Sequence, residues 1–289
     1  MKPALQRTLM TAALAAALGA TACTPPASET EAERNAAEAD RMLPVGGNAT
    51  LEDVILASET RHGIRDWEGK DSLQADMTVD FGGQRIVDGT FTFQAHGPAA
   101  RFDGADGSTV VFDGETAWAT PPEAAVPMAR FHVLTWPWFL IAPFKMDGDG
   151  VELSDLRTHS IRGREYIGIL QEFTAETGDT PDDWYRLFID PQSKELHAMS
   201  YIVTYNRDLE EANQKPSIVL YRGYADVDGA QVPNEMEFWF WDKEKGQLKG
   251  DAPKGTGSAH NLKFVQPEEG FYAQPEGAQE IPLPQTDQT

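Results

Sequence analysis

Residues Val126–Met146 read VPMARFHVLTWPWFLIAPFKM. This apolar stretch interrupts a long series of short segments that have the sequence pattern of β-strands. Six large apolar side chains lie between Trp136 and Phe144, with Pro137 and Pro143 among them. The run is too short to span a bilayer, and its prolines argue against one long helix. Three interpretations are open: a helical plug inside a sheet, a loop that dips its tryptophans into a bilayer interface, and ordinary core.

Stretches typical of β-strands lie on both sides of this segment, divided by Gly-Gly, Gly-Pro and Asp-Gly turns. They are Ser72–Phe81, Gln84–His96, Ala100–Asp103, Ser108–Phe112 and Glu115–Thr120 before it, and Val151–Ile161, Glu165–Ala175, Trp184–Ile189, Glu195–Tyr205, Ser217–Asp226 and Val232–Trp241 after it. About eleven strands in succession, hairpin after hairpin, predict an antiparallel meander.

A helix is predicted before the first strand. Thr50 and Asp53 have the spacing of a capping box, and the apolar residues that follow recur on one face. We therefore expect a helix over residues 51–67.

Several late strands, among them Glu195–Tyr205 and Glu235–Asp242, carry apolar side chains on both faces. In Glu235–Asp242, Met236, Phe238 and Phe240 share one face, while Trp239 and Trp241 lie on the other. A sheet exposed to water on one side would alternate apolar and polar residues. Either a helix packs on the second face as core, or it only partly covers a concave cavity of the size of a lipid.

The N-terminus has the pattern of a secretory leader. Lys2 and Arg7 precede the apolar run Leu9–Leu18, and the small residues Gly19–Ala22 provide a cleavage site. The apolar run is too short for a membrane span, and no stop-transfer pattern follows it. Residues 1–22 are therefore predicted to be removed on export.

The segment Ala20–Cys23 (ATAC) resembles the bacterial lipobox, in which the leader is cut before a cysteine that carries diacylglycerol and an N-acyl chain. Cys23 is the only cysteine of the chain, so it can form no internal disulfide. The alternative is an ordinary signal peptide with an incidental thiol. Thr24 stands where the family has aspartate for inner-membrane retention, which implies an outer-membrane, periplasm-facing location.

Composition limits the partners and divides the chain. The formal net charge is −22, and removing Lys2 and Arg7 with the leader makes it −24, so nucleic acid and anionic membrane surfaces are not expected as partners.

Residues 23–49 are rich in Pro, Ala and Glu and predict a flexible tether. Residues 50–265 form the predicted domain, and residues 266–289 a poorly ordered tail.

Three stretches resemble the superfamily of periplasmic lipoprotein carriers and outer-membrane lipoprotein receptors of the Lol type, with the uncharacterised lipoproteins related to them. They are the strand-turn-strand Trp184–Leu196 (WYRLFIDPQSKEL), the hairpin Tyr221–Pro233 (YRGYADVDGAQVP) with the Met-Glu-Phe that follows at 236–238, and Pro137–Val151. The likeness covers about residues 50–265.

The resemblance implies an α+β, mainly β fold: a strongly curved antiparallel sheet, an open half-barrel, with helices plugging its concave side. Family members hold acyl chains or other lipids in the cavity between sheet and helices. The residues expected to contact such a ligand are Trp136, Trp138, Phe139, Ile141 and Phe144 from the helical side and Tyr201, Val203, Trp239 and Trp241 from the sheet. The implied function is that of a membrane-anchored envelope lipoprotein in lipid or lipoprotein trafficking.

No catalytic residue, metal ligand or cofactor is predicted. The six histidines have no metal-type spacing, and no HExxH or GxSxG motif occurs. Asp147–Gly150 and Asp226–Gly229 lack the further ligands of a calcium loop and are predicted to be hairpin turns. Two other functions are weighed: an envelope interaction or stress-sensing scaffold with a packed core, and a hydrolase, which would need carboxylates converging in a cleft.

Overall fold

The computed structural model describes residues 49–174 and 178–283, which form one antiparallel sheet of 14 strands with few helices. The strands are β1 (Ser72–Phe81), β2 (Gln84–Gln94), β3 (Ala100–Gly104), β4 (Thr109–Phe112), β5 (Ala117–Thr120), β6 (Val151–Ile161), β7 (Arg164–Phe173), β8 (Tyr185–Ile189), β9 (Leu196–Tyr201), β10 (Ser217–Val227), β11 (Ala230–Asp242), β12 (Gln247–Lys249), β13 (Gly255–Val265) and β14 (Gln279–Ile281). The helices are α2 (Leu51–His62), α3 (Ile64–Trp67), α4 (Pro127–Ile141) and α5 (Leu209–Gln214), with short 3-10 turns η1 (Pro122–Ala124) and η2 (Ala142–Phe144).

The sheet consists of two meanders joined by one late strand. Its order is β14-β5-β4-β3-β2-β1-β13-β11-β10-β9-β8-β7-β6, with β12 paired to β11. The chain runs outward from β1 to β5, crosses to β6 at the opposite edge, and returns strand by strand to β11. Because β13 pairs with β1 on one side and β11 on the other, it completes the sheet. The curved sheet stays open, which confirms the predicted half-barrel.

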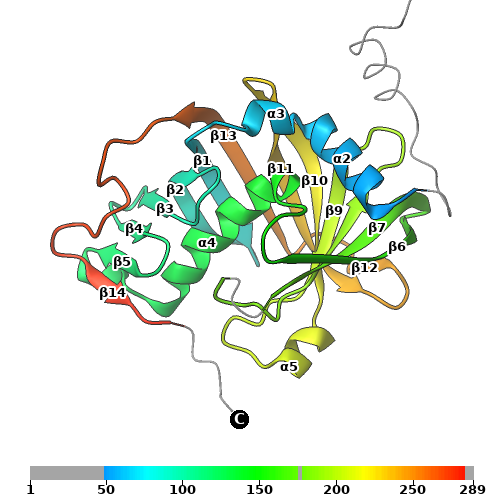
Figure 1. Cartoon of the computed structure of the whole chain (residues 1–289). Helices are drawn as coiled ribbons and strands as arrows, with labels where there is room; N and C mark the ends of the chain where they lie inside the picture. The colour runs from blue at the N-terminus through cyan, green and yellow to red at the C-terminus, as the bar shows by residue number, and fades with distance from the viewer. Residues whose placement is uncertain (1–48, 175–177, 284–289) are drawn as a thin grey trace, which may run out of the picture. The chain divides into compact units, whose positions relative to one another are not determined.

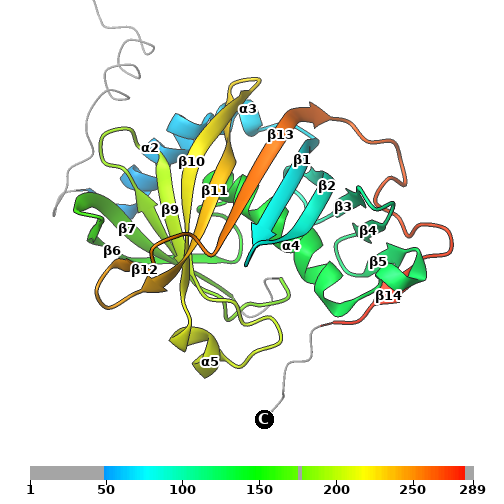
Figure 2. The same ribbon diagram turned by 180° about the vertical axis from the view of Figure 1, so that it is seen from behind.

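Helix α4 makes the crossing between the two meanders. It lies over one face of the sheet, seen from the helix side in Figure 1 and through the strands from behind in Figure 2. The predicted helical plug is therefore the interpretation that the fold supports. The expectation that prolines would break this stretch was wrong at Pro137, which lies inside α4.

The predicted N-terminal helix is present but divided into α2 and α3. Thr50 Oγ1 accepts a hydrogen bond from Asp53 N at 3.1 Å, and Asp53 Oδ2 accepts one from Thr50 N at 3.1 Å, so the capping box is confirmed. Gly63 ends α2 in the left-handed region, with φ 78°. A Cβ at Gly63 would lie 2.3 Å from the carbonyl oxygen of Gly229, so only glycine allows this close approach.

His62, the last residue of α2, ties the helix to the sheet. Its Nε2 accepts a hydrogen bond from Leu196 N at 3.0 Å, so the proton is on Nδ1, which donates to Gln231 O at 3.3 Å. Burial lowers the pKa of His62 to about 4. The neutral ring thereby connects α2 with β9 and β11.

Buried side chains fall into two clusters on opposite faces of the sheet. The larger one, on the side of α4, includes Trp136, Phe139, Val219, Met236 and Phe238. The smaller one contains Ile161, Tyr166, Phe188, Ala198, Ile218, Leu220, Trp239 and Trp241, with Leu248 of β12 packed against it. The late strands are apolar on both faces because each face has its own core.

Several sequence expectations need correction. The strands β12, β13 and β14 were not predicted, and the expected poorly ordered tail was wrong for Gln279–Ile281, which pairs with β5. Asp226–Gly229 does form the turn of the β10–β11 hairpin, whereas Asp147–Gly150 leads from η2 into β6 and joins no two strands. The leader, Cys23 and the tether up to residue 48 lie outside the described residues.

Because His62 is buried and neutral, we expect the free energy of unfolding of the protein to depend on pH. Its folded pKa of about 4 is below the ordinary 6.5, so its contribution is complete above pH 6.5 and is lost as the pH falls toward 4. For this group the loss amounts to about 3 kcal/mol at pH 4. In urea unfolding, wild type should exceed His62→Leu in stability by about 3 kcal/mol more at pH 7 than at pH 4. An equal difference at both pH values would contradict this role.

Candidate functional site

A cavity of about 1330 Å³ lies between α4 and the sheet. Both meanders contribute to it, together with the loops around residues 97–99, 178–183 and 203–207. Its apolar wall is formed by Phe81, Phe93, Phe112, Val133, Trp136, Trp138, Phe139, Ile141, Phe173, Tyr185, Tyr201 and Val203. Helix α4 thus packs as core and still leaves a cavity, so both interpretations of the second sheet face hold in part.

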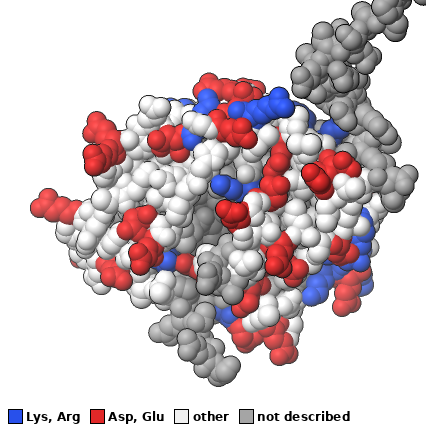
Figure 3. All heavy atoms as spheres, viewed as in Figure 1, with Lys and Arg blue, Asp and Glu red and all other residues white. Residues whose placement is uncertain are grey.

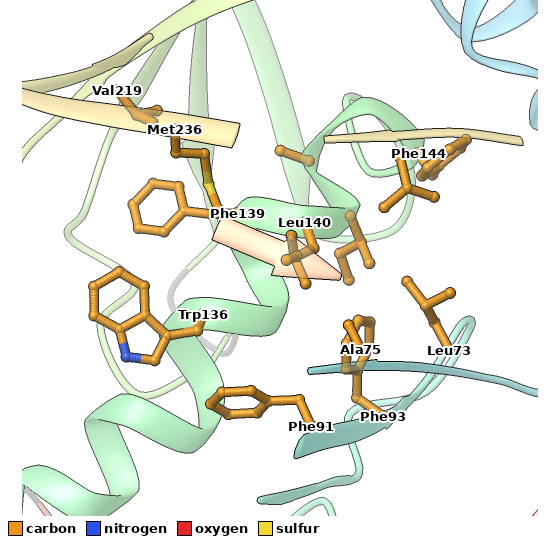
Figure 4. Close-up of a cluster of buried hydrophobic side chains, with 14 of the residues drawn as sticks. Leu73, Ala75, Phe91, Phe93, Trp136, Phe139, Leu140, Phe144, Val219 and Met236 are labelled. Atoms are coloured by element: carbon orange, nitrogen blue, oxygen red, sulfur yellow. The ribbon is translucent and has the colours of Figure 1, made fainter. Parts of the chain in front are cut away.

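Aromatic contacts hold α4 against the sheet. The ring centroids of Phe139 and Phe238 are 5.3 Å apart, and those of Trp136 and Phe238 are 5.8 Å apart. Phe139 also lies 5.2 Å from Tyr201, and Trp136 lies 6.1 Å from Phe81. In the close-up of Figure 4, Phe139 lies beside Met236, and Leu140 extends on the side of Ala75 and Leu73. One helix therefore contacts both meanders.

Pro143, which follows α4, leaves one carbonyl at the end of the helix without its usual hydrogen bond. In an α-helix the carbonyl of Phe139 would accept from the amide of residue 143, but Pro143 has no N–H. The hydroxyl of Tyr221, buried on β10, donates to Phe139 O instead, at 3.1 Å. A sheet residue thus satisfies the carbonyl and fixes the depth at which the helix sits.

Six of the nine predicted ligand contacts line the cavity. They are Trp136, Trp138, Phe139 and Ile141 from α4, Tyr201 from β9, and Val203 from the segment after it. The indole of Trp138 packs 5.8 Å from Phe173 and 5.6 Å from Tyr185. Its buried Nε1 has no hydrogen-bond partner among the described residues, which leaves a donor in the cavity wall.

The other three predicted residues lie elsewhere. Phe144 stacks on Trp67, with ring centroids 4.2 Å apart, and belongs to the core beneath α2 and α3. Trp239 and Trp241 lie on the face opposite α4. The predicted facing of β11 was wrong because Trp239 pairs with Ile218, whereas Phe238 pairs with Val219 and shares its face toward α4.

An ion pair that the sequence did not indicate closes part of the wall. Arg130 of α4 donates to both carboxylate oxygens of Asp179, at 2.6 and 2.8 Å, and to Glu115 O at 3.2 Å. Its guanidinium lies 4.8 Å from the ring centroid of Phe112. Arg130 and Asp179 are 49 residues apart, so only the folded chain reveals the pair.

Asp183 fixes a neighbouring part of the wall. It accepts hydrogen bonds from Thr204 N at 2.7 Å, from the Thr204 hydroxyl at 2.8 Å and from Thr180 at 2.9 Å. Burial raises the pKa of this carboxyl, against the effect of these hydrogen bonds. Nearby, Trp136 Nε1 donates to His132 Nδ1 at 3.0 Å, and burial lowers the pKa of His132 to about 4. Asp183 and His132 are thus both held by hydrogen bonds within the wall.

Exposed apolar side chains occur where the cavity meets solvent. Ile86, Met128 and Phe240 line it and are 38%, 42% and 52% exposed. Figure 3 shows that acidic side chains otherwise predominate among the charged groups on this face of the molecule. Apolar side chains thus line the cavity and part of its opening to solvent.

Metal-binding clusters and membrane-spanning helices are both missing from the part of the chain that the structure describes. No group of three or more His, Cys, Asp or Glu side chains in that part of the chain could hold a metal ion. Likewise, none of its helices is long and apolar enough to cross a membrane. Among the histidines, His197 stacks on Tyr166, with their ring centroids 4.5 Å apart.

Comparison with known proteins gives structural likeness alone. No family model matches the sequence, and no curated protein sequence matches it. A solved LolA superfamily protein from Nitrosomonas europaea is 9% identical and has a TM-score of 0.49, covering 78% of this chain and 98% of its own. A domain from Vibrio parahaemolyticus named for outer membrane lipoprotein sorting is 10% identical, with a TM-score of 0.47 and coverages of 76% and 95%.

A third solved structure, a DUF1329 family protein from Desulfovibrio piger, is 10% identical, has a TM-score of 0.45, and covers 75% of this chain and 96% of its own. At this level of identity no functional residue is carried over from them.

The Arg130–Asp179 pair gives a stability prediction. Arg130→Met would leave Asp179, whose side chain is 14% exposed, without its partner in the wall. Removing one member of a buried pair costs about 3 kcal/mol or more. Urea unfolding should show this loss, whereas Arg85→Met, which breaks exposed ion pairs with Asp80 and Asp88, should change the stability far less. Equal losses in both variants would contradict the structural importance of the buried pair.

Proposed function

We propose that this protein binds an apolar ligand, a lipid or an acyl chain, in the cavity between α4 and the sheet. The observation that carries the proposal is the cavity itself, of about 1330 Å³, with its wall of aromatic and aliphatic side chains. Pockets for small molecules usually measure about 300–1,000 Å³. This cavity offers room for a long chain.

The energetics favour such a ligand. Each buried methylene contributes about 0.8 kcal/mol, so a chain of about fifteen methylenes gains on the order of 12 kcal/mol before the costs of association. The exposed apolar residues Ile86, Met128 and Phe240 at the entrance offer a path that a lipid chain could follow from solvent. A cavity of this size is also the main observation against the packed-core scaffold.

We further propose that Cys23 carries the lipid anchor of an outer-membrane lipoprotein facing the periplasm. The support is the lipobox-like segment Ala20–Cys23 after a short leader. A domain that is held near a membrane and can shield an acyl chain is suited to lipid or lipoprotein trafficking. The proposed activity is binding and transfer, without chemical conversion of the ligand.

Filling the cavity tests the binding proposal. Thr135 is a half-buried residue of α4 that lines the cavity, so Thr135→Trp places an indole in the space that a chain would occupy. We expect delipidated protein to take up the uncharged fluorescent probe N-phenyl-1-naphthylamine, and the variant to bind it at least about ten-fold more weakly, a loss of about 1.4 kcal/mol.

The matched control is Thr158→Trp, an exposed position on β6 outside the cavity. Circular dichroism and thermal melting establish that both variants fold. Binding that is unchanged in Thr135→Trp, or that is lost equally in both variants, would contradict the assignment of the site. No probe uptake by the wild type would favour the packed interaction module.

The anchor is tested by metabolic labelling. Cells that express the full chain should incorporate radiolabelled palmitate into the protein, and Cys23→Ser should abolish the label, because the cysteine sulfur is the attachment point. Fractionation should then find the wild type with the outer membrane. Label that persists in Cys23→Ser would exclude this residue as the acylation site.

A further inference from the structure

The charge balance of the cavity wall differs from that of the whole chain. The chain has 24 Lys and Arg against 46 Asp and Glu. Among the residues that line the cavity, five are basic (Arg130, Lys145, Arg207, Lys215 and Lys254) and four are acidic (Glu115, Asp149, Asp179 and Asp183). Basic residues are therefore concentrated at this site in a strongly acidic protein.

Four of these nine charged residues are held by partners within the protein. Arg130 pairs with Asp179, and Lys215 pairs with Glu211 at 2.8 Å on the exposed helix α5. Asp183 is held by threonine hydrogen bonds. For Lys254, no acidic side chain of the described residues is among the groups that act on its charge, and the same holds for Lys145 elsewhere in the wall.

The position of Lys254 is fixed by its backbone. Its N–H donates to Phe238 O at 2.8 Å, and its carbonyl accepts from Gly82 N at 3.0 Å. It therefore sits where β11, β13 and the end of β1 meet, next to the cavity. The side chain begins from a rigid part of the sheet.

The ammonium group of Lys254 lies between aromatic rings. Nζ is 4.6 Å from the ring centroid of Phe240 and 5.9 Å from that of Phe81, and it donates to Ser217 Oγ at 2.5 Å. Ser217 is in turn hydrogen-bonded to the hydroxyl of Tyr201, which lines the cavity. Burial, and to a smaller degree the charge of Arg207, lower the pKa of Lys254 to about 8.

Among the described residues, this ammonium has no counter-charge. It has one neutral hydrogen-bond acceptor among its contacts, although an ammonium has three N–H donors. A partly buried charge is costly without a partner of opposite sign. A ligand that brings an anion to Nζ would provide that partner, and the nearby Arg207 would add to the attraction.

An apolar path leads from this group into the cavity. Phe81, which faces Nζ, lies 6.1 Å from Trp136, and Trp136 lies 6.1 Å from Phe139. All three rings line the cavity, while Phe240 on the outer side is exposed to solvent. The basic group thus stands at the entrance and the aromatic wall continues inward.

We propose that Lys254 binds the acidic headgroup of an amphiphile whose single acyl chain lies along Phe81, Trp136 and Phe139. This inference rests on the proposed function, since it names the chemical class of the ligand in the same cavity. A carboxylate and a phosphate monoester share the required chemistry, namely an anionic oxygen cluster that accepts from an ammonium.

Competition against the uncharged probe N-phenyl-1-naphthylamine tests the proposal in the delipidated chain that lacks residues 1–22. The competitors have the same sixteen-carbon chain and differ in the headgroup: palmitate, hexadecyl phosphate and hexadecanol. A charge-assisted hydrogen bond is worth roughly ten-fold or more in affinity. Wild type should therefore bind an acidic competitor at least about ten-fold more tightly than hexadecanol, and the stronger acidic competitor identifies the source of the headgroup.

Lys254→Met keeps the apolar stem and removes the charge, so its preference for the acidic competitors should fall to about three-fold or less while probe binding remains. Lys254→Arg should keep the preference. Lys263→Met, at an exposed position of β13, which begins directly after Lys254, and Lys145→Met, elsewhere in the wall, should also keep it.

The outcomes separate the two proposals. Probe and hexadecanol binding without any preference for an acid, or a preference that survives in Lys254→Met, would overturn the headgroup assignment and leave the apolar site standing. A preference lost in Lys145→Met and kept in Lys254→Met would also overturn it. Failure of wild type to bind the probe and all three competitors would overturn both proposals.

Discussion

The packing of α4 against the open sheet is the interaction on which the rest of this structure depends. A curved sheet of this width has an apolar concave face, and an apolar face must be covered by another element. Trp136 and Phe139 provide the cover by meeting Phe238 near the middle of the sheet. Because α4 is also the connection between the two meanders, the same 15 residues determine both the topology and the core.

The cavity follows from how little of the concave face one helix can cover. Tyr221 sets the depth of α4 through the Phe139 carbonyl that Pro143 cannot satisfy. The smaller helices α2 and α3 close one end, where Phe144 stacks on Trp67 and His62 reaches β9 and β11. The space that remains beside α4 is lined by aromatic residues and closed in part by the Arg130–Asp179 pair.

The sequence predicted most strands, and β1 and β6 with the bounds that the structure has, because alternating apolar residues and glycine turns mark them directly. It missed β13, because the buried positions in the first half of this strand are the small residues Gly255, Gly257 and Ala259. A Cβ at Gly257 would lie 3.3 Å from the methyl group of Met236, so the partner strand fills the space and the usual apolar alternation is absent. Such a strand is recognisable only when its neighbours are known.

The sequence indicated which segments form the candidate site, but it did not determine which face of the sheet their side chains lie on. The large apolar residues of the Val126–Met146 segment were identified from their density, and four of the five that were expected to contact a ligand line the cavity. On β11, both faces carry aromatic side chains, so the pattern could not decide which face met the helix, and Trp239 and Trp241 proved to lie opposite. Lys254 gave no signal in the sequence, because its isolation from acids is a property of the folded chain.

The central claim is that the cavity beside α4 is a binding site for an acyl chain. Native mass spectrometry of the chain without its leader, expressed in bacteria and purified without detergent, tests it most directly. The account predicts an adduct of one amphiphile per protein, released by organic extraction and recovered in stoichiometric amount. A protein that shows only its own mass, both as purified and after incubation with excess palmitate, would contradict the account.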